Sequence, residues 1–224
     1  MPLEDVPVPR VSLPVARVRT SVVVPLWLAD GTQISSEMIT FDGLVDDREH
    51  LAVAFGDVLT WETPLVRLHS ECLTGDVFGS ARCDCGSQLR EFLSLMRQEG
   101  GLLLYLRQEG RGIGLYNKLD AYRLQDGGMD TFEANRALNF SDDQRIYLVA
   151  AQMLLALSIH EIEILSNNPE KVRQLRSYGI SIPRQRLTGV HVTDVNRRYL
   201  KAKMKHAGHL IDIEEQITSG GMCP

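Results

Sequence analysis

Apolar and polar positions follow two different patterns along the chain, and each predicts a different kind of element. The segment SVVVPLWLADGTQISSEMITF, residues 21–41, predicts two strands joined by the turn ADGT. A continuous apolar run, GLLLYL at 101–106, is typical of a strand that is buried on both faces. EIEIL at 161–165 predicts another strand. The first segment therefore indicates antiparallel pairing, whereas the later runs indicate strands in the interior of a sheet.

Helical periodicity is found between and after these strands. LREFLSLMRQ carries apolar residues at 89, 92, 93 and 96, which is the spacing of a helical stripe. The segment 113–125 predicts a helix with one apolar side, formed by Leu115, Leu119 and Tyr122. A further helix is predicted over 143–158, with its inward face formed by Val149, Ala150, Met153, Leu154 and Leu157.

Two helix starts are marked by capping signals. DTFE at 130–133 has the form of a capping box, an Asp followed three residues later by Glu. In SNNPEKVRQLRSYGI, an asparagine cap precedes Pro169 at the first helical position, and Gly179 marks the end.

The order of these elements predicts the fold class. Strands that alternate with helices indicate an α/β fold with a mostly parallel sheet flanked by helices. The antiparallel N-terminal β region, about residues 15–65, is a candidate for a separate lobe. We expect residues 1–212 to form a single domain and residues 213–224 to form a flexible tail.

Composition and charge exclude several classes of function. Hydrophobic residues make up 44% of the 224 residues, which is enough for a core that needs no disulfides. The net charge of −5 argues against a duplex-binding protein, which is usually basic. SVVVPLWLA at 21–29 fits a strand better than a signal peptide, and YLVAAQMLLALSI at 147–159 is too short to span a bilayer. We therefore expect a cytoplasmic protein that binds neither nucleic acid nor membranes.

Three of the four cysteines lie close together in CLTGDVFGSARCDCG, namely Cys72, Cys83 and Cys85. Cytosolic thiols stay reduced, and two cysteines separated by a single residue are poorly placed to bond each other. Three thiolates suit zinc, because soft sulfur ligands favour it over magnesium or calcium. The spacing leaves three interpretations open: a catalytic zinc with a free position, a structural zinc closed by His69 or Cys223, or buried thiols without a metal.

Two loops follow predicted strands, at the place where α/β proteins bind ligands. RQEGRGIG at 107–114 offers glycines for close approach and arginines for phosphate. Its Glu109 either forms a salt bridge with a neighbouring arginine or accepts hydrogen bonds from the N1–H and amino group of guanine. SNNPEK at 166–171 leads into a helix N-terminus, which favours an anion that Lys171 can also reach. Arg67 and Lys118 are further candidates for this cluster. Each charge alone is more often a solvated surface group, but their shared position favours a phosphate ligand.

Three motifs together carry a resemblance to a known family: RLHSECLTGDVFGSARCDCGSQL, LRQEGRGIGLYNKLDAYRLQDGGMDTFEAN and NNPEKV. Over roughly residues 40–212 the chain resembles GTP cyclohydrolase II in its stand-alone form, without an adjoining synthase domain. The resemblance implies hydrolysis of GTP to 2,5-diamino-6-hydroxy-4-(5-phosphoribosylamino)pyrimidine, formate and pyrophosphate, the first committed step of riboflavin synthesis. It also implies a homodimer.

The resemblance assigns ligands to particular residues. It implies one zinc ion per subunit on Cys72, Cys83 and Cys85, and magnesium on the triphosphate. Zinc would activate water for attack on C8 and then on the formamide. This places His69 on the substrate side rather than in the metal shell. The implied GTP contacts are Arg67, Leu68, His69, Ser70, Glu71, Gln88, Glu109, Gly110, Arg111, Thr131, Ser166 and Lys171.

Three residues match catalytic positions of the family. Asp143 matches the proposed acid/base residue, Arg145 the proposed nucleophile toward the α-phosphorus, and Tyr122 a tyrosine near the reacting base. A guanidinium is almost always protonated and is a poor nucleophile, so a phosphate clamp explains Arg145 by ordinary chemistry. The alternatives are that Asp143 caps the helix predicted from 143 and that Tyr122 is a core aromatic.

The chain departs from the family pattern at three positions. Asn139 replaces a usual glycine, Ser166 replaces a usual threonine, and Asp120 stands where a basic residue is common. These changes leave room for a paralogue that stops at the formamidopyrimidine or serves a specialised pathway. Besides the working enzyme and this paralogue, a third interpretation is an inactive protein that binds nucleotide or is stabilised by zinc.

Overall fold

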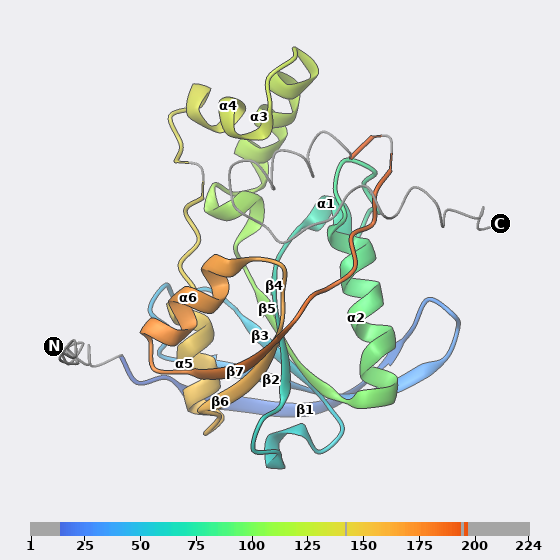
Figure 1. Ribbon diagram of the computed structural model, residues 1–224, viewed down its shortest axis with the longest axis vertical. Helices are drawn as coiled ribbons and strands as arrows, with labels where there is room; N and C mark the ends of the chain where they lie inside the picture. The colour runs from blue at the N-terminus through green and yellow to red at the C-terminus, as the bar shows by residue number, and fades with distance from the viewer. Residues whose placement is uncertain (1–13, 142, 194, 197–224) are drawn as a thin grey trace, which may run out of the picture.

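The computed structural model describes residues 14–141, 143–193 and 195–196. In this part of the chain, seven strands form one sheet in the order β1-β2-β3-β5-β4-β6-β7. The strands are β1 (Arg17–Trp27), β2 (Gln33–Asp42), β3 (Leu51–Phe55), β4 (Leu65–Ser70), β5 (Gly101–Leu106), β6 (Glu161–Leu165) and β7 (Ser181–Arg186). The α-helices are α1 (Leu73–Asp76), α2 (Cys85–Glu99), α3 (Leu115–Asp126), α4 (Thr131–Ala137), α5 (Leu148–Ala156) and α6 (Pro169–Ser177), with short 3-10 helices at Val58–Thr60 and Glu109–Gly112 (Figure 1).

The α/β class is confirmed, but the sheet is mixed rather than mostly parallel. β1, β2, β3 and β5 pair antiparallel, whereas β5, β4, β6 and β7 pair parallel. The predicted antiparallel N-terminal region exists, yet it is not a separate lobe. β3 pairs with β5 along its whole length, from Leu51 opposite Tyr105 to Phe55 opposite Gly101. The hydrogen bonds of one ladder therefore join both halves of the sheet.

Helices cover both faces of the sheet, with α2 on one side and α5 and α6 on the other (Figure 1). Phe92 of α2 packs in a cluster with Phe55 and Leu103. Leu154 of α5 packs in a second cluster with Leu104. Because side chains alternate along a strand, β5 sends residues into both clusters. The apolar run at 101–106 is thus buried on both faces, as predicted.

The predicted helix caps are confirmed. The side chain of Asn168 accepts a hydrogen bond from the N–H of Glu170 at 2.9 Å, and Pro169 is the first residue of α6. At the start of α4, Asp130 and Glu133 form the predicted capping box.

Two helix predictions need correction. The helix predicted from 143 begins at Leu148, so Asp143 does not cap it. The segment before Leu148 is instead held by backbone bonds to the loop after β5, described below. In α3, the predicted apolar stripe is wrong at Leu119, which is 45% exposed. The residue of α3 that is buried is Ala121, because α3 covers a pocket rather than the sheet.

The predicted tail at 213–224 and Cys223 lie outside the described residues. Within the described ranges, no helix combines the length and the apolar character that crossing a bilayer requires.

Candidate active site

A pocket lies at the carboxyl ends of the central parallel strands. Its wall includes residues that follow β4, β5 and β6, together with residues of α3. This is the position where open α/β sheets bind ligands. The structure brings together in this wall the predicted GTP contacts and catalytic candidates, which are Arg67, Leu68, His69, Ser70, Glu71, Gln88, Glu109, Gly110, Arg111, Tyr122, Thr131, Asp143, Arg145, Ser166 and Lys171.

The three predicted metal ligands form a compact cluster on one side of the pocket. The sulfur atoms of Cys72, Cys83 and Cys85 all lie within 4.8 Å of one another. Cys72 and Cys85 also line the pocket. Gly75 leaves the space that the cluster needs, because a Cβ there would lie 2.9 Å from the sulfur of Cys83. Three converging sulfur atoms fit a soft divalent ion such as zinc.

Charge around the cluster favours a thiolate. The ammonium of Lys118 lies 3.1 Å from the sulfur of Cys72. Hydrogen bonds from the thiols of Cys83 and Cys85, together with Lys118, hold the pKa of Cys72 well below its usual range. The hydrogen bond to Cys72 raises the pKa of Cys83 to about 11. A metal ion would therefore release protons from the other two thiols when it binds.

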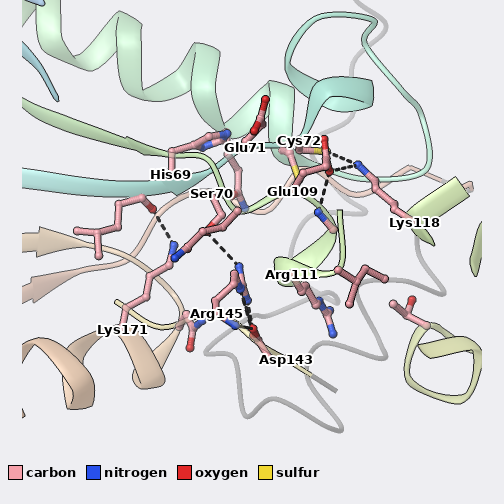
Figure 2. A pocket seen from close by; sticks show the side chains of 18 of the residues that line it. His69, Ser70, Glu71, Cys72, Glu109, Arg111, Lys118, Asp143, Arg145 and Lys171 are labelled. Carbon is pink, nitrogen blue, oxygen red and sulfur yellow. Dashed lines mark hydrogen bonds and ion pairs between the residues drawn. The ribbon is translucent and has the colours of Figure 1, made fainter. Parts of the chain in front are cut away.

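Glu109 is buried and connects three segments of the site. Its carboxylate accepts hydrogen bonds from Lys118 at 2.8 Å, from the N–H of Gly110 at 2.8 Å and from the N–H of Leu73 at 2.6 Å. The salt-bridge partner of Glu109 is thus Lys118, which the sequence placed only among phosphate candidates (Figure 2). Arg111, in the same loop, adopts a left-handed backbone with φ 61°, which is uncommon for a residue other than glycine.

The ring of His69 is held by a buried carboxylate and does not belong to the cysteine cluster among the described residues. Its Nε2 lies 3.0 Å from Asp76, which also accepts hydrogen bonds from the hydroxyl of Tyr105 at 2.9 Å and from the N–H of Cys72 at 3.0 Å. Burial lowers the pKa of His69, so the ring is neutral near pH 7. Sequence reasoning missed Asp76, although its position four residues after Cys72 in a short helix is the signal that could have found it.

A cationic end lies opposite the cysteines (Figure 2). The Nε of Arg145 donates to Asp143 at 2.9 Å, and its Nη1 reaches the hydroxyl of Ser70 at 3.5 Å. Lys171 donates to the carbonyl of Leu68 at 2.7 Å. Burial opposes ionisation of Asp143, but the hydrogen bonds and charge of Arg145 prevail and lower its pKa. Asp143 therefore holds Arg145 as a charged group that faces the pocket.

Tyr122 lines the pocket rather than the core of the sheet. The guanidinium of Arg82 lies 4.9 Å from the centre of its ring, on the side of the cysteine-rich segment. Burial raises the pKa of Tyr122 to about 12. Its hydroxyl thus remains a hydrogen-bond donor throughout the physiological pH range.

An α/β fold whose strand ends carry a thiol cluster on one side and cationic groups on the other is suited to a hydrolase of phosphorylated substrates. Comparison with known proteins identifies the family. Residues 30–187 match the family GTP cyclohydrolase II. The chain therefore belongs to the GTP cyclohydrolase II family, whose substrate is GTP, and it is a hydrolase.

Named relatives extend the match over most of the chain. It is 55% identical over 183 residues to GTP cyclohydrolase-2 of Vibrio cholerae, covering 81% of this chain and 92% of the relative. It is 51% identical over 196 residues to GTP cyclohydrolase-2 of Psychromonas ingrahamii, covering 87% and 97%. It is also 54% identical over 169 residues to the riboflavin biosynthesis protein RibBA of Bacillus velezensis, covering 75% of this chain and 42% of that longer relative.

Proposed function

We propose that the protein hydrolyses GTP to 2,5-diamino-6-hydroxy-4-(5-phosphoribosylamino)pyrimidine, formate and pyrophosphate in riboflavin synthesis. The observation that carries this proposal is that the two sides of the pocket differ in chemistry. The cluster of Cys72, Cys83 and Cys85 lies on one side, and the cationic groups Arg145 and Lys171 lie on the other. One hydrolysis acts on the imidazole ring of the base and the other on the triphosphate, so one pocket with these two sides can serve both.

Cys72, Cys83 and Cys85 would hold one zinc ion per subunit, beside the imidazole ring of the guanine. When bound, zinc supplies the Lewis acidity that makes water a nucleophile at neutral pH. Lys118 offsets the negative charge of the thiolates from 3.1 Å. The protonated hydroxyl of Tyr122 is suited to donate a hydrogen bond to the formamide oxygen and to orient it for the second hydrolysis.

The remaining wall of the pocket would hold the nucleotide. The proposed contacts are Arg67, Leu68, His69, Ser70, Glu71, Gln88, Glu109, Gly110, Arg111, Thr131, Ser166 and Lys171. Gln88 has a fixed orientation, because its carbonyl accepts from Arg67 at 3.0 Å while its amino group donates to Asp84 at 2.6 Å. The carboxylate of Glu109 has one acceptor direction left for the base after its three internal bonds.

The cationic end would receive the triphosphate together with magnesium, which would offset part of its negative charge. The N-terminus of α6, capped by Asn168, favours an anion, and Lys171 lies in the first turn of this helix. Arg145 acts as a phosphate clamp in this proposal. Its guanidinium is held in an ion pair with Asp143, so it stabilises charge that develops on the transferring group.

Incubation of the zinc-loaded protein with GTP and magnesium tests the proposal, with formate, pyrophosphate and product mass measured together. Formate and pyrophosphate in equal amounts support it. Pyrophosphate without formate supports instead the alternative paralogue that stops at the formamidopyrimidine. Neither product, with zinc bound stoichiometrically, indicates a nucleotide-binding protein without activity. Light scattering tests the expected homodimer.

A further inference from the structure

The connection between β2 and β3 reaches the loop that follows β5, although it does not line the pocket. His50, which is 2% exposed, accepts a hydrogen bond at Nδ1 from the N–H of Arg107 at 3.0 Å. Arg48 donates to the carbonyl of Arg107 at 2.9 Å. Both backbone polar groups of Arg107 are therefore bound by side chains from residues 46–50.

The partners of His50 fix its protonation state. A backbone N–H can only donate, so Nδ1 must carry a lone pair and Nε2 must carry the proton. Nε2 lies 3.0 Å from both carboxylate oxygens of Asp46, which accept a hydrogen bond from the Nε2–H. Burial lowers the pKa of His50 and outweighs Asp46, which favours the cation; the charges of Arg48 and Arg107 lower the pKa further. The ring is therefore neutral near pH 7.

The loop that begins at Arg107 is bonded to the segment that forms the cationic end of the pocket. Gln108 donates to the carbonyl of Ile146 at 2.9 Å, and the N–H of Gln144 donates to the carbonyl of Arg111 at 3.0 Å. A Cβ at Gly112 would lie 3.1 Å from the Cβ of Gln144, so the two segments are tightly packed. A shift at Arg107 would therefore move both Arg111 and the segment that carries Asp143.

We propose that His50, oriented by Asp46, is a positioning residue that fixes the peptide of Arg107 and with it the loop that carries Glu109 and Arg111. Protonation at Nδ1 would place a new N–H opposite the N–H of Arg107. The hydrogen bond between them would then be lost, and the loop would be released. The chain would thus lose nucleotide binding in acid through a group that never touches the substrate. The inference rests on the proposed function for the identity of that substrate.

Two substitutions at His50 separate positioning from mere burial. In His50→Asn, the side-chain oxygen can replace Nδ1 as the acceptor but cannot titrate. In His50→Leu, the acceptor is lost and the N–H of Arg107 is left unpaired. We expect His50→Leu to raise KM for GTP roughly tenfold or more, the effect of one unpaired buried donor. We expect His50→Asn to keep KM within about threefold of the unchanged protein, as long as an acceptor remains.

The pH profile gives the decisive signature. The unchanged protein should show an acid limb in kcat/KM from the protonation of His50, and His50→Asn should lack that limb. Asp46→Asn should move the limb to lower pH, because it removes the charge that favours the cation. An acid limb that persists unchanged in His50→Asn would overturn the proposal. This comparison does not need His50→Leu to fold.

Hydrogen exchange of the Arg107 amide tests the same inference without catalysis. At one pH near 7, the amide should be protected in the unchanged protein and in His50→Asn, and exposed in His50→Leu. Equal protection in all three would contradict the proposal even if GTP is hydrolysed. Conversely, if the Arg107 amide is protected only in the proteins that keep an acceptor at position 50, the result would support the proposal even without hydrolysis of GTP.

Discussion

The ammonium of Lys118 lies 3.1 Å from the sulfur of Cys72 and 2.8 Å from a carboxylate oxygen of Glu109. This contact joins α3, the loop after β5 and the first cysteine of the cluster at one point. Lys118 therefore connects the cysteine cluster electrostatically with the loop that carries Glu109.

Removal of this charge should weaken metal binding. Lys118→Met removes the ammonium that stabilises the thiolate of Cys72, so zinc would have to displace a proton from this thiol when it binds. We expect the affinity for zinc to fall roughly tenfold or more, as with other outer partners of metal ligands. Competition with a chromophoric chelator measures it. Arg123→Met, on the exposed side of the same helix, is the matched control. Equal affinities in the two variants would contradict this role.

Gly75 should be required for a complete metal site. In Gly75→Ala the new Cβ would lie 2.9 Å from the sulfur of Cys83 and 3.1 Å from that of Cys72. We expect purified Gly75→Ala to contain much less zinc than the unchanged protein while its circular dichroism stays similar. Ser87→Ala on α2 serves as the control. A normal zinc content in Gly75→Ala would contradict this requirement, because the sulfur atoms would then have accommodated the added Cβ.

The pH dependence should not include Asp143 near neutrality. Its pKa is lowered in the folded protein, so the stabilisation from its pair with Arg145 is present above about pH 4. That stabilisation is lost only as the pH falls through the lowered pKa. We therefore expect Asp143→Asn to reduce kcat/KM without removing any limb of the profile between pH 5 and 9. The disappearance of a limb in that interval would instead identify Asp143 as a titrating acid or base.

Arg145 should act through its charge. A clamp predicts that Arg145→Lys keeps more pyrophosphate release than Arg145→Gln, because lysine retains a cation near Ser70. If Arg145 is instead the nucleophile, both variants should lose pyrophosphate release almost completely and to the same extent. Rates of pyrophosphate release at saturating GTP distinguish the two.

Tyr122→Phe should separate the two hydrolyses. The variant keeps the ring that packs beside Arg82 but loses the hydroxyl donor. We expect the formamide to accumulate while GTP is still consumed, so that pyrophosphate release exceeds formate release. Tyr116→Phe is the control, because Tyr116 lies on the same helix and is 82% exposed. Equal loss of both products in Tyr122→Phe would contradict this assignment.

Local chemistry in the sequence predicted local structure well. The caps at Asp130 and Asn168 depend on side chains that bond to nearby N–H groups, so their signals lie within a few residues. The start of α5 could not be predicted in this way. Residues 143–147 contain no glycine or proline that would stop a helix, but bonds from Gln144 to Arg111 and from Gln108 to Ile146 hold them outside it.

The site was predictable where a motif carried it and unpredictable where it depended on contacts between distant segments. The spacing of the cysteines indicated a metal cluster, and the sulfur atoms do converge. In contrast, Lys118 reaches Cys72 from another helix, and His50 reaches Arg107 from the other half of the sheet. No periodicity or spacing in the chain encodes these contacts, because they follow from the strand order.

The interior position of β4 in the sheet also shapes how the protein must assemble. Val66 pairs with Leu102 on one side and with Ile164 on the other, so both neighbours of this strand come from far along the chain. Such distant pairings slow folding, because the loops between them must close first. A nascent chain has no finished cavity until Thr188, the last wall residue among those that the structure describes, has emerged. Since a ligand of the finished cavity does not recognise earlier intermediates, it should raise the melting temperature of the whole domain.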